Sequence, residues 1–171
     1  MANRKIILIV DNVRSAHNVG SLLRTADAMA VERVYLVGIS PHPKVPNDKR
    51  LPHVVTKAEQ DIRKTALGAE KSLDIIYLEN KQLKATMTGL RVGGYTIAAL
   101  EQTDGATRLN KFTAPDNIGL IVGNEIDGLD RPTLELADIH LSIPMLGTKE
   151  SLNVAVATGM ALYHLRFAGQ G

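Results

Sequence analysis

Short apolar runs rich in β-branched residues alternate along this chain with longer stretches of helical periodicity. The runs are predicted to be strands at residues 6–10, 34–37, 75–78, 96–100, 119–122 and 139–143. The stretches are predicted to be helices at residues 18–30, 58–67, 81–90, 132–137 and 152–167. Strands that alternate with helices are typical of an α/β fold, in which helices cover both faces of a mainly parallel sheet. A chain of 171 residues suits one such domain.

Composition excludes several classes of chemistry. The chain has no cysteine, which rules out disulfides, thiolate catalysis and cysteine-ligated metal. Its five histidines do not have the spacing of metal ligands, so we expect no metal. The glycine-rich phosphate loops of dinucleotide and triphosphate sites are also missing, which disfavours an α/β enzyme that uses those cofactors. The apolar run near the start is too short for a signal peptide or a membrane span, so we expect a cytoplasmic protein.

Charge is close to balanced, with a formal net charge of +2. Residues 41–72 nevertheless hold seven basic side chains against four acidic ones, and four prolines at positions 41, 43, 46 and 52 predict an irregular loop at their start. Two interpretations stay open. The segment is either a basic surface that meets phosphates or an ordinary solvated loop and helix face.

Three motifs lie beside expected strand ends or helix starts. The first is Asn18-x-Gly20-x-x-x-Arg24, the second is Gly123-x-Glu125-x-x-Gly128, and the third joins residues 143–145 to residues 151–153. Each combines permissive backbone with one or two polar side chains. Ligand sites of α/β proteins form at the carboxyl ends of parallel strands, so the three motifs can supply one site.

Each motif also has a purely structural interpretation. Asn18 can cap a helix, and Gly20 can allow close approach of a ligand or of a facing backbone. Arg24 lies four residues beyond Gly20, where its guanidinium can reach a phosphate or carboxylate. The second motif can be a surface turn that pivots at Gly128. Ser151 can be the cap of the last helix.

Together the motifs resemble those of the SpoU (TrmH-like) family of the SPOUT superfamily, which are S-adenosylmethionine-dependent RNA ribose 2′-O-methyltransferases. The likeness covers nearly the whole chain, and the third motif is the most diagnostic. It implies an α/β knot, in which the C-terminal segment forms a trefoil knot, although general rules on chain threading argue against knots. It also implies a homodimer with the knot region at the interface.

The resemblance also implies the site residues. The family's catalytic residues fall on Asn18, Arg24, Glu125, Ser151 and Asn153. The residues that bind the donor, S-adenosylmethionine, fall on Gly123, Ile143, Met145 and Leu152.

The expected reaction transfers a methyl group to a ribose 2′-hydroxyl of RNA, with tRNA favoured over ribosomal RNA. We expect one SpoU-type domain over residues 1–171, without the N-terminal RNA-binding extension that many relatives carry. An alternative is a non-catalytic RNA-binding protein that retains the fold. That alternative predicts the loss of a polar motif residue, and none is lost here.

Overall fold

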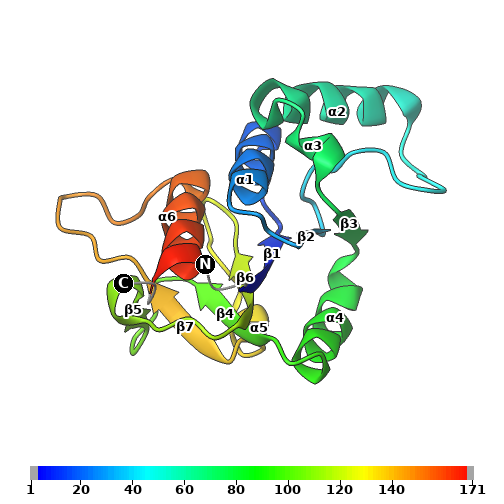
Figure 1. Ribbon diagram of the computed structural model, residues 1–171. Helices are drawn as coiled ribbons and strands as arrows, with labels where there is room; N and C mark the ends of the chain where they lie inside the picture. The colour runs from blue at the N-terminus through cyan, green and yellow to red at the C-terminus, as the bar shows by residue number, and fades with distance from the viewer. Residues whose placement is uncertain (1–3, 169–171) are drawn as a thin grey trace.

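The computed structural model of the protein describes residues 4–168, and its centre is a parallel sheet (Figure 1). Seven strands lie in the order β3-β2-β1-β6-β4-β7-β5, and every neighbouring pair is parallel. The strands are β1 Lys5–Asp11, β2 Arg33–Val37, β3 Ile75–Leu78, β4 Thr96–Leu100, β5 Thr107–Arg108, β6 Asn117–Val122 and β7 Ile139–Ser142. Because all strands run the same way, their carboxyl ends lie along one edge of the sheet.

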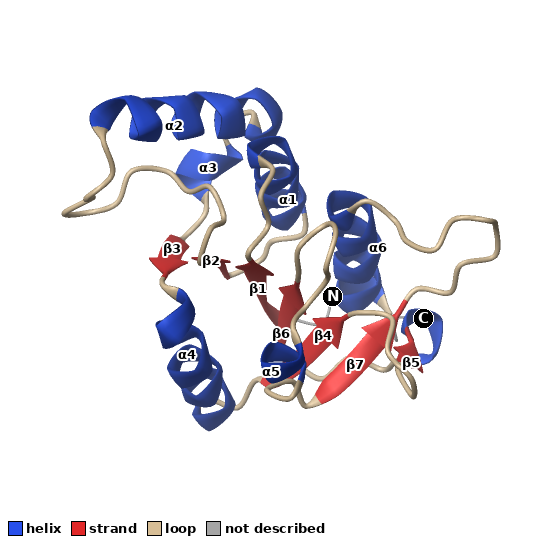
Figure 2. Cartoon of the chain, turned by 180° about the vertical axis from the view of Figure 1, so that it is seen from behind, coloured by secondary structure: helices blue, strands red, loops and turns tan. Residues whose placement is uncertain are grey.

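Helices cover both faces of this sheet (Figure 2). The helices are α1 Ala16–Ala28, α2 Pro52–Ala66, α3 Ala69–Ser72, α4 Asn80–Val92, α5 Arg131–Leu134 and α6 Val154–Phe167, with a 3₁₀ turn at Leu109–Lys111. Alternate residues of β1 point to opposite faces. Ile6 and Leu8 pack in the core beneath α1, α2, α3 and α6, while Ile7 and Ile9 pack in the core on the α4 and α5 side. The central strands are apolar throughout because both of their faces are buried.

The predicted α/β class is confirmed, and the six predicted strands are present to within two residues at each end. Helix ends differ more. Helix α1 begins at Ala16 because the Ser15 hydroxyl caps it, accepting the Asn18 backbone N–H at 3.2 Å. Helix α2 begins at Pro52, six residues before the predicted start, because proline suits the first helical position.

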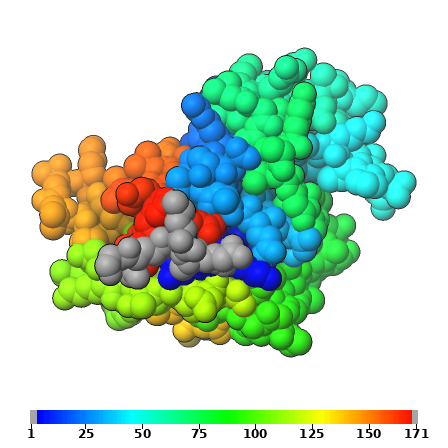
Figure 3. Space-filling model, viewed as in Figure 1, coloured from blue at the N-terminus to red at the C-terminus, as the bar shows by residue number. Residues whose placement is uncertain are grey.

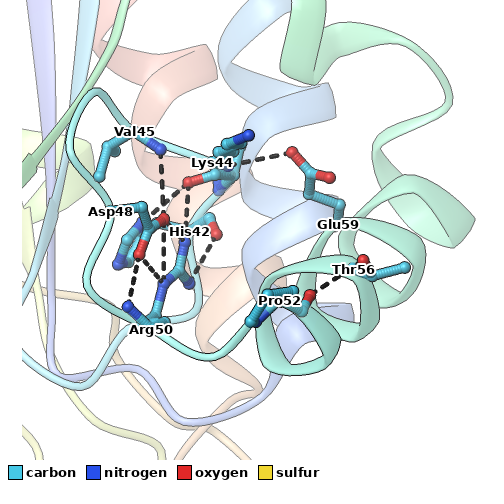
Figure 4. A network of polar contacts seen from close by, with 9 residues as sticks. His42, Lys44, Val45, Asp48, Arg50, Pro52, Thr56 and Glu59 are labelled. Atoms are coloured by element: carbon cyan, nitrogen blue, oxygen red, sulfur yellow. Dashed lines mark hydrogen bonds and ion pairs between the residues drawn. The ribbon is translucent and has the colours of Figure 1, made fainter.

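The proline-rich loop between β2 and α2 has a defined internal structure (Figure 4). The Arg50 guanidinium donates to the Asp48 carboxylate, with a shortest distance of 2.6 Å, and to the carbonyls of His42 and Pro43. The His42 ring stacks on Tyr77 with ring centroids 3.9 Å apart. These contacts fix the path of residues 39–51 beside the carboxyl edge of the sheet.

The same contacts bear on the basic segment. Arg50 forms an ion pair with Asp48. On α2, Lys57 and Lys64 both form ion pairs with Asp61, at 2.9 and 2.7 Å. Much of the positive charge of residues 41–72 is therefore balanced within the segment, and whether the remainder meets phosphates stays a prediction.

Helix α6 is docked on the molecule at its C-terminal end. The Arg166 guanidinium donates to the carbonyls of Met29, Ala30 and Arg4, at 2.9, 2.8 and 2.6 Å. These bonds join the end of α6 to the end of α1 and to the start of β1. Within residues 4–168, no helix combines the length and the apolar character needed to cross a membrane.

Candidate active site

Side chains from all three motifs join in one chain of hydrogen bonds. The Glu125 carboxylate, in the loop after β6, accepts the Asn18 side-chain amide at 2.8 Å. The Asn18 side-chain carbonyl accepts in turn from the Asn153 side-chain amide, at 3.2 Å. Glu125 also accepts the backbone N–H groups of Arg14 and Ser15, at 3.3 and 3.4 Å. The loops after β1, β6 and β7 therefore meet at one place, as the strand-end argument requires.

Glu125 is held as a carboxylate. Its burial raises the pKa, but the hydrogen bonds from Asn18 and from the backbone N–H groups outweigh burial and leave the pKa below its ordinary value. An ionised Glu125 only accepts hydrogen bonds, so it fixes the orientation of the Asn18 amide. The Asn18 carbonyl oxygen consequently faces Asn153.

Asn153 has a second role that the sequence interpretation missed. Its side-chain carbonyl accepts the Ala155 N–H at 2.9 Å, which makes Asn153 the cap of α6. The helix therefore begins at Val154, two residues later than predicted, and Ser151 is not its cap. Ser151 is exposed and lies instead on the wall of a cavity.

That cavity lies between the carboxyl ends of β4, β6 and β7 and the start of α6. All four residues expected to bind the donor line it: Gly123, Ile143, Met145 and Leu152. The rest of its wall includes the end of β4 and the side chains of Val122 and Leu141. The walls are largely apolar, with backbone groups from three strand ends, as suits an adenosine-like group.

The turn that carries Glu125 is shaped by its neighbours. The Asn124 side-chain carbonyl accepts the Ile126 N–H at 2.8 Å, and its amide donates to the Asn12 carbonyl at 3.3 Å. Asn124 thus ties the turn to the loop after β1. The sequence interpretation did not single Asn124 out, although asparagine inside a tight turn is a recognised signal for such side-chain-to-backbone bonds.

Glu101 was also missed. It follows β4 directly and lines the cavity, and its carboxylate accepts the Leu129 N–H at 3.0 Å. A polar residue next to the end of a predicted strand is the signal that could have found it, because ligand sites gather at such ends.

Arg24 lies apart from the other motif residues. It is exposed on α1 and does not line the cavity. Six residues separate it from Asn18, a rise of about 9 Å along the helix. Within residues 4–168 its guanidinium has no hydrogen-bond or ion-pair partner, so it is free to bind a ligand that comes from outside this chain.

Gly20 serves helix packing. A Cβ at this position would lie 2.3 Å from the Ile62 carbonyl oxygen and 2.1 Å from the Thr65 hydroxyl, both on α2. Of the two interpretations offered by the sequence, close approach of a facing backbone is the one observed.

The histidines show no metal site. In the described part of the chain, no group of three or more His, Asp or Glu side chains is placed to hold a metal ion. His140 is half-buried, and its ring nitrogens contact the Thr103 hydroxyl at 2.9 Å and the Leu134 carbonyl at 3.1 Å. Both ring nitrogens of His140 are thus taken up by contacts within the fold.

Comparison with known proteins identifies the family of this chain. The model of the SpoU rRNA Methylase family matches residues 5–163. The 23S rRNA (guanosine-2'-O-)-methyltransferase RlmB of Neisseria meningitidis serogroup B is 36% identical over 94% of this chain and 58% of the relative. A putative TrmH family tRNA/rRNA methyltransferase of Staphylococcus epidermidis is 31% identical over 96% of this chain and 59% of the relative. The chain thus spans somewhat less than three fifths of these curated relatives.

Among solved structures, the A. aeolicus TrmH/SpoU tRNA modifying enzyme superposes with a TM-score of 0.76 at 27% identity, covering 96% of this chain and 76% of that one. The likeness confirms the predicted resemblance and, with it, the α/β knot as fold class. The family match spans most of the chain and includes all three motifs, so the chain belongs to the SpoU rRNA methylase family.

Proposed function

We propose that this protein transfers the methyl group of S-adenosylmethionine to a ribose 2′-hydroxyl of RNA. One observation carries the proposal. The hydrogen-bonded chain Glu125–Asn18–Asn153 joins three separate motifs beside a cavity lined by the four residues expected to bind the donor. Each motif taken alone has an ordinary structural explanation, but a helix cap or a surface turn does not require the other two motifs to be next to it.

S-Adenosylmethionine would supply a methyl group on a positively charged sulfur. The cavity walls suit it, because strand-end backbone from β4 and β7 and apolar side chains line the space. Ser151 and Leu152 form the part of the wall nearest the start of α6. Their place next to Asn153 couples the donor cavity to the hydrogen-bonded chain.

We assign binding of the acceptor ribose to the polar residues of the motifs. Glu125 fixes the Asn18 amide, and Asn18 and Asn153 together present an ordered polar surface to the ribose. Arg24 is assigned to the phosphate beside the acceptor and to the negative charge that develops on the 2′-oxygen, because a guanidinium is positively charged and is a poor base. As the new carbon–oxygen bond forms, the carbon–sulfur bond breaks with its electron pair on sulfur, and the hydroxyl proton passes to water.

A homodimer is part of the proposal. Helix α6 exposes Val156, Met160, Tyr163 and Phe167, which are spaced to lie along one side of the helix. The fractional exposure of these side chains is 52, 47, 62 and 40%. An apolar stripe of this length on a surface helix commonly marks a protein interface. A second copy packed there would place both copies' third motifs close to the interface.

The RNA class is the open part of the proposal. The sequence-based expectation favours tRNA, whereas the Neisseria relative is named for 23S rRNA and the A. aeolicus structure for tRNA modification. The test therefore uses both tRNA and 23S rRNA as substrates. Purified protein, methyl-labelled donor and either unmodified tRNA or unmodified 23S rRNA are incubated in parallel, and the product nucleosides are identified. A 2′-O-methylated nucleoside in one pool supports the proposal and identifies the substrate class.

The matching variant is Arg24→Ala. Loss of the positive charge should lower kcat/KM for RNA by at least about a hundredfold, the usual effect of removing a group that stabilises developing charge. Donor affinity should stay within a factor of about two, because Arg24 does not line the cavity. Activity near that of the unaltered protein would remove Arg24 from the mechanism. Donor binding without transfer to either RNA would favour the alternative of a binding protein that retains the fold.

A further inference from the structure

Glu101 occupies a defined position on the wall of the donor cavity. It follows the last residue of β4, and its two carboxylate oxygens accept different backbone N–H groups. One oxygen accepts the Leu129 N–H and the other the Gln102 N–H, both at 3.0 Å. Two amides that belong to different loops therefore hold this carboxylate in place.

The turn after β6 is built around this carboxylate. Gly128 has a φ of +68°, and a Cβ there would lie 2.3 Å from the Glu101 carboxylate. A side chain at position 128 would thus displace the carboxylate as well as strain the backbone. A Cβ at Gly123, at the other end of the turn, would lie 2.6 Å from the Gly128 carbonyl carbon, so the turn is closely packed there as well. The close approach of Gly128 and the two backbone hydrogen bonds leave the Glu101 side chain little freedom to move.

Glu101 also differs in charge from the rest of the wall. Of the described residues that line the cavity, it alone has an ionisable side chain. A carboxylate offers about four acceptor positions, and the two backbone N–H groups use half of them. Its negative charge lies at the wall of a largely apolar cavity, where electrostatic interactions are less screened than in water.

The donor and its product differ mainly in charge. S-Adenosylmethionine carries a sulfonium, an ammonium and a carboxylate, for a net charge of +1. After methyl transfer the sulfur is a neutral thioether, and S-adenosylhomocysteine has no net charge. The two molecules are otherwise nearly the same shape. A fixed carboxylate in the cavity attracts the donor more than the product, whereas apolar walls and backbone groups bind both about equally.

We propose that Glu101 is the residue that makes this cavity select the positively charged donor over the neutral product. The inference rests on the proposed function. It assigns to the site a means of releasing product, because the attraction from Glu101 weakens at the moment the methyl group leaves.

Calorimetric titration of the full chain with each ligand tests the proposal. Glu101→Gln keeps the shape of the side chain and removes its charge. In this variant the Kd for S-adenosylmethionine should rise roughly tenfold, and the Kd for S-adenosylhomocysteine should stay within a factor of about two. Glu150→Gln is the matched control, because Glu150 is exposed in the loop before α6 and does not line the cavity. It should leave both affinities unchanged.

A second variant separates charge from structure. Glu101→Asp keeps the charge and shortens the side chain, so overall affinity falls while preference for the donor is retained. If Glu101→Gln weakened both ligands by the same factor, Glu101 would only support the turn, and the proposal would be overturned. Unchanged affinities would overturn it as well. If the unaltered protein bound neither ligand, the proposed function itself would fail, a result distinct from either of these.

Discussion

The contact between α1 and α2 at Gly20 makes a sharp test of what this glycine does. In Gly20→Ala the new Cβ would lie 2.3 Å from the Ile62 carbonyl oxygen, 2.1 Å from the Thr65 hydroxyl and 3.0 Å from the Ala66 nitrogen. The Thr65 hydroxyl can rotate away, but it then gives up its 2.9 Å hydrogen bond to the His17 carbonyl. The Ile62 carbonyl belongs to the α2 backbone and cannot rotate, so the helices must separate.

The size of the effect follows from three contributions. Overpacking in a tight contact costs about 2–3 kcal/mol. Loss of the Thr65 hydrogen bond adds about 1 kcal/mol. Alanine is the better helix former and returns about 1 kcal/mol. The free energy of unfolding should therefore fall by about 2–3 kcal/mol, which lowers the Tm of a domain of this size by roughly 4–12 °C.

Urea-induced unfolding followed by circular dichroism measures this change. Protein concentration is held constant, because a dimer makes apparent stability depend on concentration. Gly89→Ala is the matched control, since Gly89 is exposed inside α4 and a Cβ there would meet nothing within 4 Å. The control should gain up to about 1 kcal/mol from helix propensity. If Gly20→Ala were as stable as the control, the close approach of α1 and α2 would not be the reason for this glycine.

Two further predictions concern pH and assembly. Burial, with the negative charge of Asp130 as the second cause, raises the pKa of Asp11 from 3.8 to about 6. Between these values the folded protein binds a proton that the unfolded chain releases, so stability falls as pH rises through this window. Asp11→Asn should remove this dependence of stability on pH and raise the free energy of unfolding at pH 7 by up to about 3 kcal/mol. Urea titrations at pH 4 and pH 7 measure the change. If stability still fell between these pH values in the variant, Asp11 would not be its cause. Met160→Glu, in the middle of the exposed α6 stripe, should convert the proposed dimer to a monomer in sedimentation analysis. Val92→Glu, at the exposed end of α4 and away from the stripe, should not. A dimer that survives Met160→Glu would place the interface elsewhere.

Much of the fold could be predicted because the central strands are buried on both faces. Strands such as β1 and β6 read as unbroken apolar runs, and the amphipathic stretches between them supply the covering helices. Strand β5 and helix α3 were not predicted, since two and four residues are too few to show a periodic pattern. Helix starts were less accurate because Ser15 and Asn153 cap α1 and α6, and several nearby polar residues were equally suitable caps.

The site was predictable in part for a different reason. Motif residues at strand ends converge whenever the strands are parallel, which is why Asn18, Glu125 and Asn153 meet. The sequence pattern does not show which distant residue each side chain contacts in the folded protein. The approach of Gly20 to α2, and the support of the Gly128 turn by Glu101, are contacts between segments more than 25 residues apart. Such contacts follow from tertiary packing, which local pattern does not encode.

The chemical character of the site points to positioning as the main source of rate. In the proposed reaction the 2′-hydroxyl loses a proton, yet the assigned residues include no strong base. Glu125 has a lowered pKa and already accepts three hydrogen-bond donors, while Asn18 and Asn153 are neutral amides. The guanidinium of Arg24 is a poor base. Since no group here is suited to remove the proton before attack, the hydroxyl and the methyl group must be held in line while the proton leaves late, and alignment of this kind can supply several kcal/mol of the barrier. A rigid chain of hydrogen bonds across three strand ends is the arrangement that such alignment requires.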